Sequence, residues 1–174
     1  MKNIFASLRK DKTVLMELFH EELKDIYGAE KQILAALPRM KEAATSPDLA
    51  LAFEDHLHIT EDQIERLEKV FSLLKQEPES KKCKGIAGLI DEAEEVISET
   101  DEGTATRDVG LIISAQKVEH YEIAAYGSLR QLAKSISTDI SALLEETLQE
   151  EKETDMLLSN LADMMINADA EKEE

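Results

Sequence analysis

The chain has 174 residues, and its 38 acidic side chains against 20 basic ones give a formal net charge of −18. This excess of negative charge excludes nucleic acid and anionic membrane as partners, because both require positive protein surface. The length predicts one domain with a proper hydrophobic core. We place that domain at residues 1–168 and expect residues 169–174 to form an acidic, disordered tail.

The single cysteine, Cys83, indicates the cellular compartment of the protein. One cysteine excludes an internal disulfide and fits a reducing environment. The opening stretch MKNIFASLRKDK carries charges every few positions and has no apolar run of the kind found in signal peptides or membrane spans. We therefore expect a cytoplasmic protein. The thiol of Cys83 is interpreted as a packing group rather than a catalytic one.

Composition predicts a helical protein, since the chain has three prolines, six glycines and 4% aromatic residues. The first helix is expected over residues 13–44. Its apolar positions recur with a spacing near 3.6, at Phe19, Leu23, Ile26, Ile33, Leu34 and Leu37. Pro38 is expected to kink or interrupt the last turns.

The second helix is expected to begin at Ser46-Pro47-Asp48, which combines a hydroxyl cap, a proline at the first helical position and an acid in the first turn. It should run to about residue 75. A short amphipathic helix over residues 86–98 follows, and two more long helices are expected over residues 106–135 and 140–168.

Connection lengths predict how these helices pack. Short connections make the first two long helices antiparallel neighbours, and likewise the last two, whereas about thirty residues separate the two pairs. The predicted fold is therefore all-α, a ferritin-like four-helix bundle with a long crossover and a short fifth helix.

Several ionisable residues fall on the apolar stripes of these helices, near the middle of each. In an antiparallel bundle, mid-helix positions share one level, so these side chains are expected to converge. Thr60 and Tyr126 lie on the same stripes, and Glu22 is a weaker candidate. The candidate metal ligands are Glu30, His56, Glu119, Glu122, Glu151 and Asp155.

Energetics decide what such a convergence means. Each buried ion loses several kcal/mol of hydration, whereas a domain has only about 5–15 kcal/mol of net stability. Five carboxylates must therefore be protonated, paired, hydrated or bound to metal. Two divalent cations would bring +4 against −5 and accept oxygen and imidazole ligands. Two alternatives stay open. His56 could be a hydrogen-bonded core residue and not a ligand, and the apolar stripes could be narrower than drawn, which would leave some of the carboxylates outside them.

The remaining histidines, His20, His58 and His120, lie off the best stripe of their helices and are left out of the predicted site. Tyr27 and Tyr126 are interpreted as packing residues whose hydroxyls reach a carboxylate. Arg66 only borders the second stripe, so the predicted site lacks an inward base.

Four stretches of the chain closely resemble the YciF/YciE family of bacterial stress-response proteins. The resemblance covers nearly the whole chain, from about Leu15 to Leu161, and the run QKVEHYEIAAYG is highly specific. The stretches are DIYGAEKQ at 25–32, HLHIT at 56–60 with QIER at 63–66, QKVEHYEIA at 116–124, and TLQEEK at 147–152 with Thr154-Asp155.

The resemblance implies a ferritin-like bundle with a fifth short helix, a homodimer, and an architecture related to rubrerythrin. Two departures bear on the site. The family usually reads His-Leu-x-Glu-Thr where this chain has Ile59 before Thr60, which removes a carboxylate. The fourth long helix also lacks the histidine that ferritin-like di-iron proteins carry there.

Two functional hypotheses follow from this sequence. The first is a dimeric protein that binds two iron or manganese ions, or one because of Ile59, with Glu119 as the expected bridging carboxylate. Such a protein would act on oxygen or peroxide, or handle the metal. The second is a non-catalytic helical stress protein with a degenerate, hydrated site.

Overall fold

Helices make up nearly all of the computed structural model, which describes residues 14–173 and contains no strand within them. The all-α prediction is confirmed. The first thirteen residues of the predicted domain and the last residue of the predicted tail lie outside the described range. The helices are α1 (Val14–Ala43), α2 (Pro47–Leu73), α3 (Lys84–Glu99), α4 (Ala105–Ala133), α5 (Thr138–Leu161) and α6 (Asn167–Ala170), with a π-helical turn at Ala162–Ile166.

Helix α1 buries the predicted stripe, including Phe19, Leu23, Ile33 and Leu37. It continues through Pro38 to Ala43, so the expected interruption does not occur. Pro38 is exposed. Its ring lies on the solvent side, where a helix can bend away from a proline without losing core contacts.

The predicted start of α2 is confirmed. The Ser46 hydroxyl accepts a hydrogen bond from the Leu49 amide at 3.4 Å, and Pro47 occupies the first turn. The Asp108 carboxylate, from α4, accepts bonds from the amides of Thr45 and Ser46, both at 2.7 Å. These amides have no partner within the helix, so Asp108 ties the α1–α2 turn to the start of α4.

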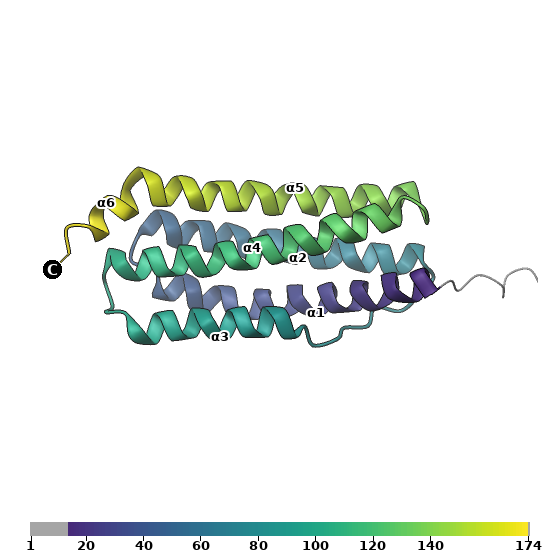
Figure 1. Ribbon diagram of the computed structural model, residues 1–174, viewed down its shortest axis with the longest axis horizontal. Coiled ribbons are helices and arrows are strands. Elements are labelled where there is room, and N and C mark those ends of the chain that lie inside the picture. The colour runs from purple at the N-terminus through teal and green to yellow at the C-terminus, as the bar shows by residue number, and fades with distance from the viewer. Residues whose placement is uncertain (1–13, 174) are drawn as a thin grey trace, which may run out of the picture.

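The four long helices lie side by side, each in contact with two others (Figure 1). Helix α1 contacts α2 and α4, and α5 contacts the same two helices. Within each pair, α1 with α2 and α4 with α5, the two helices run in opposite directions, whereas α2 and α4 run in the same direction (Figure 1). The crossover that reverses the chain contains α3, which packs against α1 and α4.

The crossover lies directly on α1 at Gly28. A Cβ atom there would overlap the carbonyl oxygen of Lys81, and the Lys81 amide donates to the Lys24 carbonyl at 3.0 Å. Only glycine allows the two backbones to approach this closely. Just beyond this contact, Cys83 is fully buried and its thiol lies 3.0 Å from the Tyr121 hydroxyl, which agrees with a packing role.

The carboxyl-terminal end departs from the predicted stripe. In the sequence, helical spacing from Leu144, Leu148 and Leu158 leads to Met165 as the next buried position, but Met165 is 51% exposed and Ile166 is buried at 4%. The π-helical turn explains the difference, because its wider loop shifts the buried face by one residue. Further on, the Glu173 carboxylate accepts bonds from the amides of Ala105 and Thr106 at 2.6 and 2.9 Å, at the start of α4.

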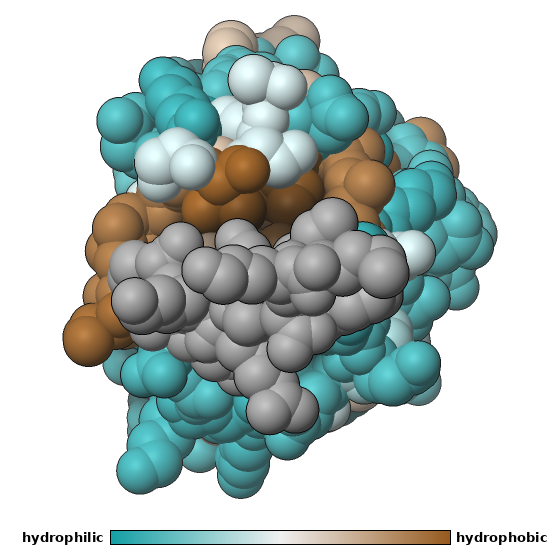
Figure 2. Space-filling model, turned by 90° about the vertical axis from the view of Figure 1, so that its right-hand side faces the viewer, coloured by the Kyte–Doolittle hydropathy of each residue, from teal (hydrophilic) through white to brown (hydrophobic). Residues whose placement is uncertain are grey.

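Exposed apolar side chains gather at the end of the molecule where α1 begins. Figure 2 shows hydrophobic surface beside the grey trace on this end, within a mainly hydrophilic surround. The exposed apolar residues of these helix ends are Val14, Leu15, Leu18 and Leu73. None of the described helices combines the length and apolar character needed to cross a membrane.

Candidate metal centre

Five of the predicted ligands lie inside the molecule. Glu30 on α1, His56 on α2, Glu119 and Glu122 on α4, and Glu151 on α5 are all at most 4% exposed. They reach the interior because each continues the buried stripe of its helix. Four of the five offer one ligand atom each within 4.8 Å of all the others, namely His56, Glu119, Glu122 and Glu151.

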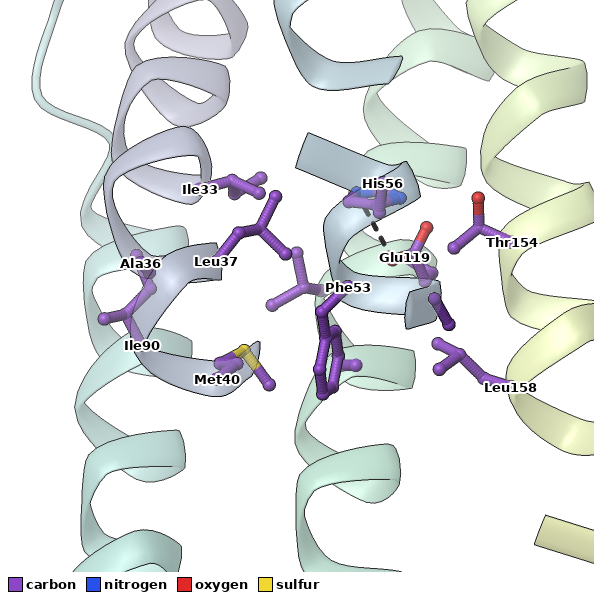
Figure 3. A pocket seen from close by; sticks show the side chains of 13 residues that line it. Ile33, Ala36, Leu37, Met40, Phe53, His56, Ile90, Glu119, Thr154 and Leu158 are labelled. Atoms are coloured by element: carbon purple, nitrogen blue, oxygen red, sulfur yellow. Dashed lines mark ion pairs between the residues drawn. The ribbon is translucent and has the colours of Figure 1, made fainter. Parts of the chain in front are cut away.

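Neighbouring side chains hold one atom of several of these groups. Gln63 Nε2 donates to Glu151 Oε1 at 2.6 Å, and the Tyr126 hydroxyl donates to Glu30 Oε1. His56 Nε2 lies 3.7 Å from Glu119 Oε1, and a dashed line marks this pair in Figure 3. Hydrogen bonds therefore orient the carboxylates of Glu151 and Glu30 from one side.

The second atom of each group lacks a partner. Within the described residues, buried side-chain atoms without a hydrogen bond include Oε2 of Glu30, Glu119 and Glu151, both oxygens of Glu122, and Nδ1 of His56. A buried acceptor without a partner costs about 1–3 kcal/mol or more when charged. Native proteins leave few such groups, so their concentration at one point makes this cluster a candidate binding site.

Burial and mutual repulsion perturb the pKa of every carboxyl group here. Burial raises the pKa of Glu30 and of Glu122 well above the ordinary range, and the nearby Glu151 raises both further. Burial and Glu151 do the same to the pKa of Glu119. Burial also raises the pKa of Glu151, to about 7.

His56 shows the opposite shift for the same reason. Burial disfavours the charged imidazolium and lowers the pKa of His56 to about 4. The ring is therefore neutral at pH 7. A neutral imidazole is the form that binds a metal ion.

The residues fit a metal ion on these observations. Two ligand atoms on opposite sides of one ion lie about 4–5 Å apart, which matches the spacing of the four-residue group. Their chemistry, carboxylate oxygen with one imidazole nitrogen, suits iron or manganese. The nearest base cannot neutralise the cluster, because both Arg66 terminal nitrogens bind Glu150, at 2.7 and 2.8 Å.

The sixth predicted ligand, Asp155, lies at the edge. Its carboxylate is half-buried, accepts from Gln116 Nε2 at 3.1 Å and lies 3.4 Å from His120 Nε2. It does not belong to the four-residue group. Glu22, the weaker candidate, is exposed on the surface of α1.

The histidines left out of the prediction do lie outside the centre. His58 and His120 are exposed, and His20 lies 3.2 Å from the Gln76 amide nitrogen. The expectation for the tyrosines is confirmed, since Tyr27 donates to Glu68 at 2.6 Å and Tyr126 to Glu30.

Sequence reasoning missed Gln63 as part of the centre. Its side chain is fully buried and its amide nitrogen bridges Glu151 and Glu150, at 2.6 and 3.1 Å. Gln63 lies seven residues after His56, two turns along the same face of α2, and this spacing could have revealed it. Ile59, the departure noted in the sequence, is half-buried between them and offers no ligand.

Together, these features define an all-helical protein with a buried histidine–carboxylate cluster. Residues 14–171 match the family described as "Domain of unknown function (DUF892)". The chain is 45% identical over 157 residues to Protein YciF of Escherichia coli (strain K12), covering 89% of this chain and 94% of that protein. The chain belongs to this family, and the predicted resemblance to YciF is confirmed.

Solved structures give the same relationship. The crystal structure of the E. coli stress protein YciF matches with a TM-score of 0.83 at 41% identity, covering 94% of this chain and 100% of that one. YcfI from Rhodopseudomonas palustris matches with a TM-score of 0.82 at 41% identity, covering 87% and 96%. A protein from Xanthomonas campestris, at 22% identity and a TM-score of 0.70 over 91% and 97%, shares the fold.

Proposed function

We propose that this YciF homologue is a ferritin-like, metal-carboxylate protein of the bacterial stress response, acting in the cytoplasm as a homodimer. In this proposal the four long helices form a ferritin-like bundle whose interior holds iron or manganese. His56, Glu119, Glu122 and Glu151 bind the first ion. A second ion depends on Glu30 and Asp155.

One observation carries the proposal. Gln63 and Tyr126 each satisfy one oxygen of a buried carboxylate, and the other oxygen of that carboxylate has no partner. A hydrated or degenerate site would not need this arrangement, because water could satisfy both oxygens. A cation needs one free lone pair from each of several residues, held in place by neighbours.

Each neighbour has a separate task in the proposed centre. Gln63 fixes the direction of the Glu151 carboxylate, and Tyr126 does the same for Glu30. His56 stays neutral and presents its free nitrogen. Surrounding apolar residues exclude bulk water, which strengthens every charge interaction inside. A bound iron or manganese ion would supply a redox-active centre able to react with oxygen or peroxide.

Metal analysis tests this proposal directly. Protein purified without chelator, and again after iron or manganese loading, should contain close to one ion per chain or more, and its melting temperature should rise with metal. Glu119→Gln combined with Glu151→Gln should abolish both effects, whereas the exposed Glu153→Gln should keep them. Less than about a tenth of an ion per chain, with no change in melting temperature, would overturn the proposal.

The second candidate function is a non-catalytic stress protein with a degenerate site, favoured by Ile59 and by the absence of a histidine on the fourth long helix. It predicts that the double glutamine variant is more stable than the parent under all conditions, because charge repulsion is relieved. The metal-binding proposal expects that gain only in chelator. With manganese present, the parent should become the more stable protein.

A further inference from the structure

A small cavity lies between the helices beside the candidate metal centre, and we call it the apolar chamber. It has a volume of about 30 Å³ and is lined by thirteen residues, all of them apolar except His56, Glu119 and Thr154. Figure 3 shows Leu37 pointing towards the His56–Glu119 pair, and the Phe53 ring directed away from that pair. The chamber therefore shares two residues with the candidate centre.

The volume limits the occupant to a very small molecule. A single water needs about 10–15 Å³ of such space. The chamber consequently has room for a molecule of about two heavy atoms. Larger organic substrates are excluded.

The lining selects against polar occupants. The Thr154 hydroxyl already donates to the Glu150 carbonyl at 3.1 Å. The unpartnered atoms of His56 and Glu119 are those proposed to hold the cation. With the cation on these atoms, a water or peroxide in the chamber would lack the two to four polar partners it needs, and burying a hydroxyl without a hydrogen bond is unfavourable. An apolar molecule pays no such penalty.

Partial exposure of the lining residues indicates where the chamber comes closest to solvent on the α3 side. Leu37 and Leu158 are buried, but Ala36, Ile90 and Val118 are only half-buried, on α1, α3 and α4. The rim of the chamber thus lies where the crossover helix covers the α1–α4 edge. These three rim residues are apolar, whereas Thr154 on α5, the other half-buried lining residue, is polar. The α3 side is therefore the side on which an apolar gas meets no polar barrier.

We infer that the apolar chamber binds dioxygen and presents it to the metal centre at His56 and Glu119. This inference rests on the proposed function and narrows its co-substrate, because it selects dioxygen over peroxide. Binding itself requires only the chamber. It can therefore be measured in the metal-free protein.

The experiment uses the paramagnetism of dioxygen. Metal-free protein with ¹³C-labelled leucine methyl groups is equilibrated with oxygen or nitrogen, and methyl proton relaxation is compared. The Leu37 and Leu158 methyls should relax several-fold faster under oxygen than those of Leu23 and Leu144, which are equally buried away from the chamber. Equal oxygen effects on both sets would overturn the inference, without need of any variant.

A matched pair of variants tests the location. Ala36→Leu adds a side chain at the rim, whereas Ala35→Leu adds the same group at the exposed neighbouring position. The oxygen effect at Leu158 should fall to the level of the control methyls in Ala36→Leu and stay unchanged in Ala35→Leu. An unchanged effect in a folded Ala36→Leu would place the gas elsewhere and overturn the inference.

Failure of the dioxygen-binding inference can be distinguished from failure of the proposed function. Metal binding without faster relaxation at the chamber would overturn the dioxygen site and leave the proposed metal centre standing. Faster relaxation at the chamber without metal binding would overturn the proposed function, and with it the presentation of dioxygen to a metal.

Discussion

The metal-free protein should lose stability as the pH rises, because of the buried carboxyl groups. For Glu151, burial raises the pKa from its ordinary 4.5 to about 7, which corresponds to about 3 kcal/mol of unfolding free energy. A raised pKa means that the folded state holds its proton more tightly than the unfolded state does. This contribution is therefore complete below pH 4.5 and lost as the pH passes 7.

The expected loss of unfolding free energy can be worked out for the range from pH 5.5 to pH 8. Between pH 5.5 and 8, Glu151 alone should cost the protein about 2 kcal/mol. The raised pKa values of Glu30, Glu119 and Glu122 act in the same direction, so the total fall should be larger. Excess manganese should remove the fall, because a bound cation keeps the carboxylates ionised in the folded state.

Urea unfolding in chelator at pH 5.5, 7 and 8 measures this dependence. Glu151→Gln should reduce the loss of stability by about 2 kcal/mol over the range. Glu153→Gln, an exposed substitution on the same helix, should leave it unchanged. A parent protein as stable at pH 8 as at pH 5.5, or the same fall in Glu151→Gln, would refute the reasoning.

Three further variants address the residues around the centre. Gln63→Leu removes the hydrogen-bond donor to Glu151 and should weaken manganese binding, measured by calorimetry, about 10- to 100-fold. The exposed control variant Gln149→Leu should bind manganese as the parent does. Equal affinities in Gln63→Leu and the parent would contradict the positioning role of Gln63. Tyr126→Phe leaves a buried Glu30 oxygen without its donor and should cost about 1–3 kcal/mol in urea unfolding, while Tyr27→Phe, whose partner Glu68 is exposed, should cost less. Ile59→Glu should raise the metal content per chain, measured by elemental analysis. The control variant His58→Glu adds a carboxylate at an exposed position. Equal metal content in the two variants would argue against Ile59 as the missing ligand position.

The inward direction of the candidate ligands was predictable from sequence because helical periodicity alone sets it. Glu30 has apolar neighbours three and four residues away on both sides, so it lies on the buried face of α1 together with them. Glu119, Glu122 and Glu151 follow the same logic. The burial of His56 was predicted in the same way, although its neutral state emerges only from the surrounding helices.

Other features depend on contacts that periodicity cannot supply. The π-helical turn moves the buried position from Met165 to Ile166, and the turn contains no proline or glycine from which it could have been predicted. Asp155 lies on the predicted stripe, yet it is held at the edge by Gln116 on α4. Periodicity places Gln63 on the same face as His56, but its hydrogen bond to Glu151 on another helix requires the packed structure.

A core built for stability alone would place leucines where this chain has Glu30, Glu119, Glu122 and Glu151. Ionising these groups without a counter-charge costs several kcal/mol each, against a net stability of about 5–15 kcal/mol for a domain. Protonation relieves this cost, and the raised pKa values extend that relief from low pH towards neutral pH. Once the groups ionise, the cluster needs a counter-charge between the carboxylates, and the unpartnered oxygens are the atoms that would bind the proposed cation.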